Sequence, residues 1–232
     1  MKGQFLNKAF HTLTEAFQNC LKRFPTTVCF VLALTAYLAY LVSTEMDDEK
    51  KLTLVLGYYF SVGTLLSLTL HLWSEEIKNR IKEISVHIVM HVLLIADAVY
   101  LYSLSPERSL TEISIAHGAA ILALWLSVFF LSFTQEKNDI PSWNFASYTV
   151  GAFVTANVVG LIMSGGISLL VFSLHQLFDV DVSWKCYLYI LVVCSVLLPM
   201  LLFLGMLPKN KLKHNQEPQP SEFLNGTIHF LF

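Results

Sequence analysis

The residue best placed to do chemistry in this sequence is Asp97, a carboxylate inside an apolar run long enough to cross a lipid bilayer. A charge at that depth costs at least about 2.5 kcal/mol, so the group is protonated, paired or beside water. At ~1.5 Å per helical residue, Asp97 lies roughly 10 Å from one membrane face, and His117 on the next run lies roughly 8 Å from that face. We predict that the two are partners, either as a proton relay or ion site, or as an interhelical hydrogen bond that holds a bundle together.

Three histidines form a second candidate group. His87 and His91 are four residues apart on one helical face, and His71 lies at a similar level on the preceding apolar run. Three imidazoles near one membrane surface are able to bind a transition metal. However, Asp97 is rotated by about 120° from His91 around the helix and would not complete such a site. We therefore expect interfacial histidines and no metal site.

Small residues recur at every fourth position in the fifth apolar run, at Ala152, Ala156, Gly160, Ser164 and Ser168. Such a stripe lets two helix backbones approach closely in lipid, where hydrophobicity alone gives no drive for association. We predict a helix-packing face that contacts other membrane helices or a second copy of the chain. A broken helix at Gly165-Gly166, of the kind that forms transporter substrate sites, is the alternative. Pro199 predicts a kink in the last run.

Other catalytic and binding signatures are missing from the sequence. It contains no G-x-S-x-G, H-E-x-x-H or P-loop pattern, and its four cysteines form no C-x-x-C pair. We predict no catalytic residue and no cofactor. An intramembrane enzyme would need a second polar group facing Asp97, and His117 is the candidate. A net charge of −2 without a Lys/Arg block argues against nucleic acid as a partner.

The composition indicates the compartment. Of 232 residues, 55% are hydrophobic and 14% are charged, whereas soluble domains carry roughly 25% charged residues. Windows of about 20 apolar residues, the length that crosses a bilayer, occur six times. They cover residues 24–43, 52–73, 84–104, 112–133, 145–175 and 184–207. We predict an all-α polytopic transmembrane bundle of six spans over residues 24–207, with the lipid bilayer as its environment.

The two ends of the chain differ from this middle part. In residues 1–23, apolar side chains recur at three- and four-residue steps opposite Lys2, Lys8, Glu15 and Lys22. This pattern predicts an amphipathic helix in the membrane interface, or alternatively a surface helix packed on a partner protein. Residues 208–232 combine a polar stretch with an apolar segment of about ten residues, too short to span. We expect a cytoplasmic linker and the start of a further segment of a longer chain.

The basic residues predict an orientation. If the N-terminus is inside, eleven of the fifteen Lys and Arg residues fall in cytoplasmic segments. The four on the opposite side are Lys50, Lys51, Arg108 and Lys185. Because positive charges gather in cytoplasmic loops, both termini are predicted to be cytoplasmic.

Several short motifs in the second half resemble one family. Trp143-Asn144, the Gly-rich fifth run, Leu177-Phe178 with Val180, Tyr187 and the stretch from Pro199 to Pro208 are similar to the domain-of-unknown-function 4153 family of multi-pass bacterial inner-membrane proteins, as is Lys22-Arg23-Phe24-Pro25 before the first run. The resemblance implies a bacterial inner-membrane location and a multi-pass architecture, and it supplies no catalytic residue. We expect a non-catalytic assembly or regulatory component, or alternatively a transporter that uses Asp97 with His117.

Overall fold

The computed structural model describes residues 20–44, 50–75, 80–104, 106–130 and 140–207. Within these ranges every regular element is a helix, which confirms the predicted all-α fold. In chain order the elements are α2 (Pro25–Ser43), α3 (Lys50–Ser74), α4 (Arg80–Ser103), α5 (Pro106–Phe130), α6 (Ile140–Phe178), α7 (Trp184–Val192), the π-helical segment η2 (Val193–Leu197) and α8 (Leu198–Met206). The predicted interfacial helix lies outside the described residues except for 20–23, which are helical, and so does the tail over 208–232.

Five of the described helical stretches are long and apolar enough to cross a membrane. They are Pro25–Ser43, Lys51–Ser74, Ile84–Ser103, Ser142–Phe178 and the continuous Trp184–Met206. These stretches make the chain a membrane protein. The predicted span over 112–133 corresponds to the helix α5, in which the described apolar stretch, Ser114–Val128, is shorter than the other five. The described residues thus contain five long apolar helices where six spans were predicted, and the end of the predicted run, residues 131–133, lies outside them.

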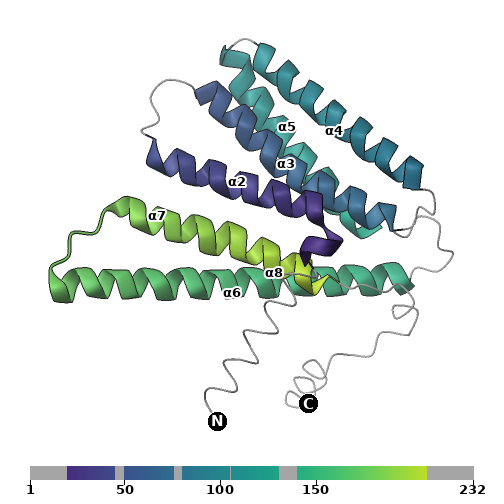
Figure 1. The fold of residues 1–232 in the computed structure, drawn as a ribbon. Helices are drawn as coiled ribbons and strands as arrows, with labels where there is room; N and C mark the ends of the chain where they lie inside the picture. The colour runs from purple at the N-terminus through teal and green to yellow at the C-terminus, as the bar shows by residue number, and fades with distance from the viewer. Residues whose placement is uncertain (1–19, 45–49, 76–79, 105, 131–139, 208–232) are drawn as a thin grey trace, which may run out of the picture.

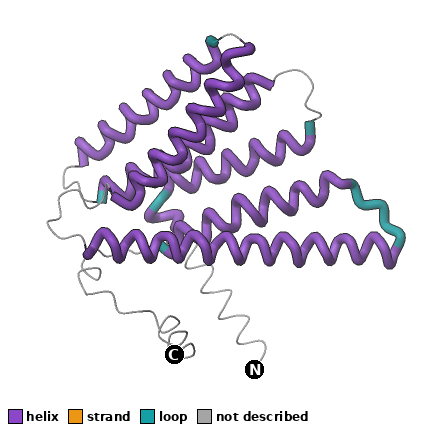
Figure 2. Tube along the Cα trace, turned by 180° about the vertical axis from the view of Figure 1, so that it is seen from behind, coloured by secondary structure: helices purple, strands orange, loops and turns teal. Residues whose placement is uncertain are grey.

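The helices form two groups joined by α2. In Figure 1, α3, α4 and α5 lie side by side, α6 lies beneath α7 and α8, and α2 runs between the groups; Figure 2 shows the same arrangement from behind. One buried cluster holds α3, α4 and α5 together, with Tyr58, Val62, Leu94 and Ala98 among its members. A second cluster unites α2 with α6 and α8, through Phe24, Val28, Ala156 and Phe203 among others.

The outer faces of the bundle are apolar, as a bilayer requires. On α4, the exposed large side chains include Ile88, Val92 and Val99, and on α6 they include Leu161 and Leu169. In water, this much exposed apolar surface would be strongly unfavourable. Facing lipid, it needs no protein partner.

The last span is continuous but irregular at the point where Pro199 predicted a kink. Pro199 lacks an N–H and its ring collides with the carbonyl four residues earlier, so a regular α-helix is interrupted there. The chain absorbs this with the π-helical turn of η2, in which the Leu198 N–H donates to the Val193 carbonyl five residues back. The π-helical turn thus lies directly before Pro199, where the sequence predicted a kink.

No such break occurs in α6. The helix is continuous for 39 residues through Gly165 and Gly166, so the alternative of a broken helix at this pair is wrong. Glycine permits a break but does not force one. In lipid, a break would leave backbone N–H and C=O groups without hydrogen-bond partners, and this cost keeps the helix intact.

Candidate functional site

The site around Asp97 is organised by α3. Tyr58 and Ser61 are three residues apart and therefore lie on the same face of this helix. Tyr58 is only 4% exposed and belongs to the cluster that holds α3, α4 and α5 together. The central helix thus presents a phenol and a hydroxyl to both of its neighbours.

Asp97 of α4 and His117 of α5 meet at these two side chains. The Tyr58 hydroxyl donates a hydrogen bond to Oδ2 of Asp97. Ser61 Oγ lies 2.9 Å from Nε2 of His117. The Tyr58 and His117 rings pack edge to face with centroids 5.7 Å apart. The structure therefore brings Asp97 and His117 to one place, but through Tyr58 rather than by a direct hydrogen bond within the described part of the chain.

Tyr58 and Ser61 were missed at the sequence level although a signal was available. Lys51 marks one end of α3, and Tyr58 lies seven residues further along, roughly 10 Å deep at ~1.5 Å per residue. That depth equals the one counted for Asp97. Polar side chains at equal depth on neighbouring spans are expected to pair, because lipid offers them no other partner.

The acidic group of the site is the carboxylate of Asp97. Among the described residues, no lysine or arginine pairs with Asp97, and Tyr58 is its hydrogen-bond partner. Both Asp97 and His117 are half-buried. A carboxylate in this position is either protonated or able to attract a cation.

The three histidines form a row in which each ring contacts the next. His71 packs edge to face on His87 at 5.5 Å, and His87 stacks on His91 at 6.2 Å between centroids. Nδ1 of His91 lies 2.8 Å from the His87 carbonyl oxygen, which ties this imidazole to its own helix. No group of three or more His, Cys, Asp or Glu side chains in the described ranges is arranged to hold a metal ion. The histidines join α3 to α4 by ring contacts.

The small-residue stripe packs against another helix of the same chain. Ala152 and Ala156 are buried in the cluster with Phe203 and Leu204 of α8. A Cβ added to Gly160 would lie 2.5 Å from the Cys194 carbonyl oxygen and 2.5 Å from Cγ of Pro199. Ser164 is also buried, and Ser168 is half-buried. The stripe does pack against a helix, and that helix is the chain's own last span.

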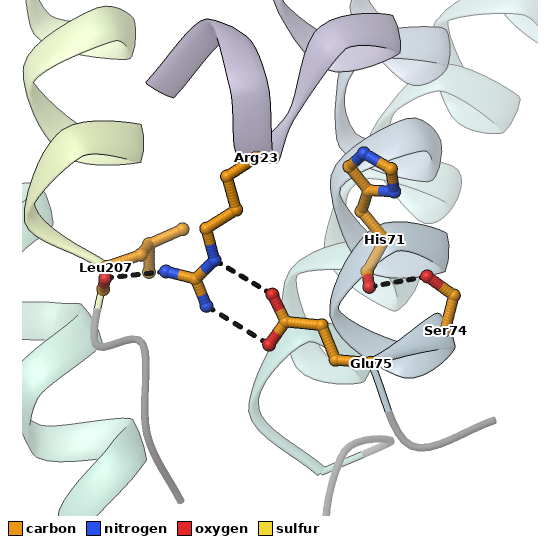
Figure 3. Close-up of polar contacts among 5 residues, drawn as sticks. All are labelled: Arg23, His71, Ser74, Glu75 and Leu207. Carbon is orange, nitrogen blue, oxygen red and sulfur yellow. Dashed lines mark hydrogen bonds and ion pairs between the residues drawn. The ribbon is translucent and has the colours of Figure 1, made fainter. Parts of the chain in front are cut away.

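Beside the His71 end of the row, a charged cluster ties three segments together (Figure 3). Arg23 Nε donates to Oε1 of Glu75 at 2.8 Å, and a terminal guanidinium nitrogen donates to Oε2 at 3.1 Å. The other terminal nitrogen donates to the Leu207 carbonyl oxygen at 2.8 Å. Arg23 thereby connects the start of α2 with the end of α3 and caps the C-terminal end of α8.

Two lysines cap helix ends in the same manner at the opposite end of the bundle. Lys51 Nζ donates to the Leu104 carbonyl at the end of α4. Lys185 Nζ donates to the Ser43 carbonyl at the end of α2 at 3.2 Å. A cation at a helix C-terminus satisfies a free carbonyl and complements the helix dipole. Lys51 and Lys185 are two of the four basic residues that the predicted orientation places on the side opposite the cytoplasm. Both therefore have a structural role.

An apolar cavity of about 20 Å³ lies where α2, α3, α5, α6 and α8 meet. Its lining includes Val31, Leu68, Trp125, Phe153 and Phe203. Its volume equals little more than one water molecule, and an apolar cavity of this kind stays dry. It lies between the two helix groups.

Comparison with known proteins identifies no relative. No family model matches the chain, and no curated protein and no solved structure is significantly similar to it.

Proposed function

We propose that this chain is a non-catalytic regulatory component of a bacterial inner membrane, whose α3–α4–α5 bundle responds to a proton or cation at Asp97. One observation carries the proposal. A carboxylate half-buried between membrane helices is hydrogen-bonded to a buried phenol, and that phenol packs on an imidazole from a third helix. Ionisable residues in membrane spans are rare because they are costly, and they mark ion or proton sites by default.

The position of the site explains how it would act on the bundle. Tyr58 belongs to the central helix, Asp97 to α4 and His117 to α5, so a change of charge at Asp97 alters the packing of three helices at once. The groups that face the carboxylate in the described structure are the Tyr58 hydroxyl and, beyond it, the His117 ring with Ser61. Among the residues that the structure describes, no lysine or arginine pairs with Asp97.

The experiment compares Asp97→Asn with the wild type in lipid nanodiscs. We expect the thermal unfolding midpoint of the wild type to change with pH. Asp97→Asn should remove part of this dependence, because an amide side chain, unlike a carboxylate, does not take up or release a proton. Asp179→Asn, at an exposed turn outside the spans, is the control and should keep the wild-type profile. Identical pH profiles for Asp97→Asn and the wild type would contradict the proposal.

A transporter is the second candidate, and the partial exposure of Asp97 and His117 favours it. Transport requires that the ion reach both sides of the membrane, which a regulatory site does not. Proton or cation flux into liposomes that contain the chain distinguishes the two functions. Flux that Asp97→Asn abolishes supports transport, and a pH-dependent stability without flux supports regulation.

We also propose that both termini are cytoplasmic and that the chain belongs to the domain-of-unknown-function 4153 family. The excess of Lys and Arg on one side supports cytoplasmic termini. The short motifs around Trp143, Tyr187 and Pro199 support membership of the domain-of-unknown-function 4153 family. The sequence predicted that the stripe from Ala152 to Ser168 contacts other membrane helices or a second copy of the chain. In the structure, this stripe packs on η2 and α8 of the same chain. Association with other helices or with a second copy would therefore have to use other faces.

A further inference from the structure

We propose that the turn end of the α6–α7 hairpin is a lipid-binding surface that fits a bilayer whose hydrocarbon core is thicker than the usual ~30 Å. This surface, the apex, comprises residues 169–184. The inference does not depend on the Asp97 site. It concerns the kind of membrane in which the chain is most stable.

The helix α6 is longer than a bilayer is thick. Its 39 residues include no Asp, Glu, Lys or Arg, and at ~1.5 Å per residue they extend over roughly 57 Å. To fit a core of ~30 Å by tilting alone, α6 would have to tilt by roughly 58°, whereas membrane helices tilt by at most about 40°. The spans Pro25–Ser43 and Ile84–Ser103, of 19 and 20 residues, match the usual core. The excess length therefore belongs to α6.

The excess length lies at the turn end of the hairpin. Near the start of α6, Phe145 is buried in one cluster with Phe24 and Leu207, so this end is fixed beside the start of α2 and the end of α8. At the other end of the bundle, Lys185 of α7 donates to the carbonyl of Ser43, the last residue of α2. There α6 runs past the ends of both α2 and α7, as Figures 1 and 2 show.

The apolar side chains of the apex are exposed around most of the helix. Those on α6 that are at least 50% exposed are Leu169, Leu170, Phe172, Leu174, Leu177 and Phe178. At ~100° per residue they are spread over roughly 240° of the helix circumference. A helix that packs on one partner buries a stripe of roughly 100°, so a second copy of the chain would leave most of these side chains uncovered. Acyl chains surround a helix, and the apex continues the exposed apolar surface of Leu161 and Ile162 on the same helix.

The turn carries the groups expected at a membrane surface. Asp179 and Asp181 are exposed and directly follow the apolar end of α6. Trp184, at the start of α7, is 65% exposed, and tryptophan is enriched at membrane–water interfaces. The first charges thus come only after Phe178, which places the apolar residues 169–178 within the hydrocarbon core. Even at a tilt of 40°, a helix of this length covers ~44 Å along the membrane normal.

The test varies the thickness of the bilayer. The apparent thermal midpoint of the full chain is measured in nanodiscs of monounsaturated phosphatidylcholines with acyl chains of roughly 14, 18 and 22 carbons, which differ in thickness and share one headgroup. We expect the highest midpoint at 22 carbons, because the thickest core covers the apex. A highest midpoint at 14 or 18 carbons would overturn the inference.

Polar substitutions distinguish the apex from the rest of α6. The double variant Leu174→Ser with Leu177→Ser makes the apex polar and should move the highest midpoint to the 18-carbon bilayer. The matched control is Val158→Ser with Leu161→Ser, which has the same spacing on the same helix at exposed positions in the middle of the span. This control should lower the midpoint in all three bilayers and leave the highest value at 22 carbons. The inference fails if the apex variant keeps its maximum at 22 carbons, or if both double variants move it alike.

A cross-linking experiment tests whether a second copy covers the apex instead. Leu177→Cys, oxidised in the 22-carbon bilayer, should yield no more disulfide-linked dimer than the wild type, whose native cysteines serve as the control. A dimer that forms only in the variant would assign the apex to a second copy and overturn the inference. Asp97→Asn should keep its highest midpoint at 22 carbons, so a failure here leaves the proposed function at Asp97 untouched.

Discussion

The guanidinium of Arg23 and the carboxylate of Glu75 face each other in two parallel hydrogen bonds of 2.8 and 3.1 Å. The two residues are 52 positions apart in the chain, and the pair joins the start of the first span to the end of the second. Arg23 also donates to the carbonyl of Leu207, the residue after α8, and its guanidinium lies 4.7 Å from the centroid of the Phe24 ring. One side chain thus connects both helix groups at this end of the bundle.

Replacement of Arg23 by alanine should destabilise the protein measurably. The Arg23 side chain is only 14% exposed, so the loss should lie between the values for surface and buried ion pairs, at about 1–3 kcal/mol. Arg23→Lys keeps the charge but loses the two-pronged geometry and should recover only part of the stability. The apparent thermal midpoint in nanodiscs measures the effect, and Lys22→Ala, at an exposed neighbouring cation, is the control. Equal midpoints for Arg23→Ala and Lys22→Ala would show that the cluster is not stabilising.

A larger residue at Gly160 should separate α6 from the last span. Any Cβ there collides with the Cys194 carbonyl and the Pro199 ring at 2.5 Å, and neither backbone nor proline ring can rotate away. We expect Gly160→Leu to cost at least about 2 kcal/mol. Gly165→Ala and Gly166→Ala lie on the same helix with open space around them, so they should be neutral or stabilise it by up to about 1 kcal/mol. Comparison of the three midpoints distinguishes close packing from a general sensitivity of α6 to substitution, and equal effects at all three positions would refute the packing argument.

The turn after α6 contains a strained residue. Asp179 has a φ of 52°, in the left-handed region that glycine adopts without penalty and other residues adopt at a cost. Asp179→Gly should therefore raise stability by about 0.5–1 kcal/mol. Asp181→Gly, two residues further on, adds flexibility to the unfolded chain without relieving strain and should lower stability. A decrease for Asp179→Gly as large as that for Asp181→Gly would mean that the carboxylate itself is needed.

The orientation can be tested with reporter fusions at the C-terminus. If both termini are cytoplasmic, a C-terminal green fluorescent protein should fluoresce and a C-terminal alkaline phosphatase should be inactive. Lys185→Met removes the cap on Ser43 and should lower stability by about 0.3–1 kcal/mol, yet it should not invert the chain, because it removes a charge from the side with few positive charges. An active phosphatase in the wild type would overturn the predicted orientation.

The helical class and the membrane environment follow from the sequence alone. Apolar runs of this length have one stable form in lipid, since a helix satisfies its backbone hydrogen bonds internally. Asp97 and His117 could be placed at a common depth by counting residues, because the helical rise is constant. The irregularity before Pro199 was equally predictable, since the missing N–H is a local property of proline.

The partners of these residues were decided by the tertiary structure. Counting along a helix gives depth but not the neighbouring helix, so the sequence makes Tyr58 a candidate partner at the depth of Asp97, and only the fold shows that Tyr58 lies between Asp97 and His117. The stripe around Gly160 predicted close packing, yet only the fold shows that the packing partner is the chain's own last span. The ion pair of Arg23 with Glu75 likewise forms only when distant segments of the chain fold into contact. The pattern of one sequence indicates which helix faces are able to pack, but it does not indicate which two helices pack against each other.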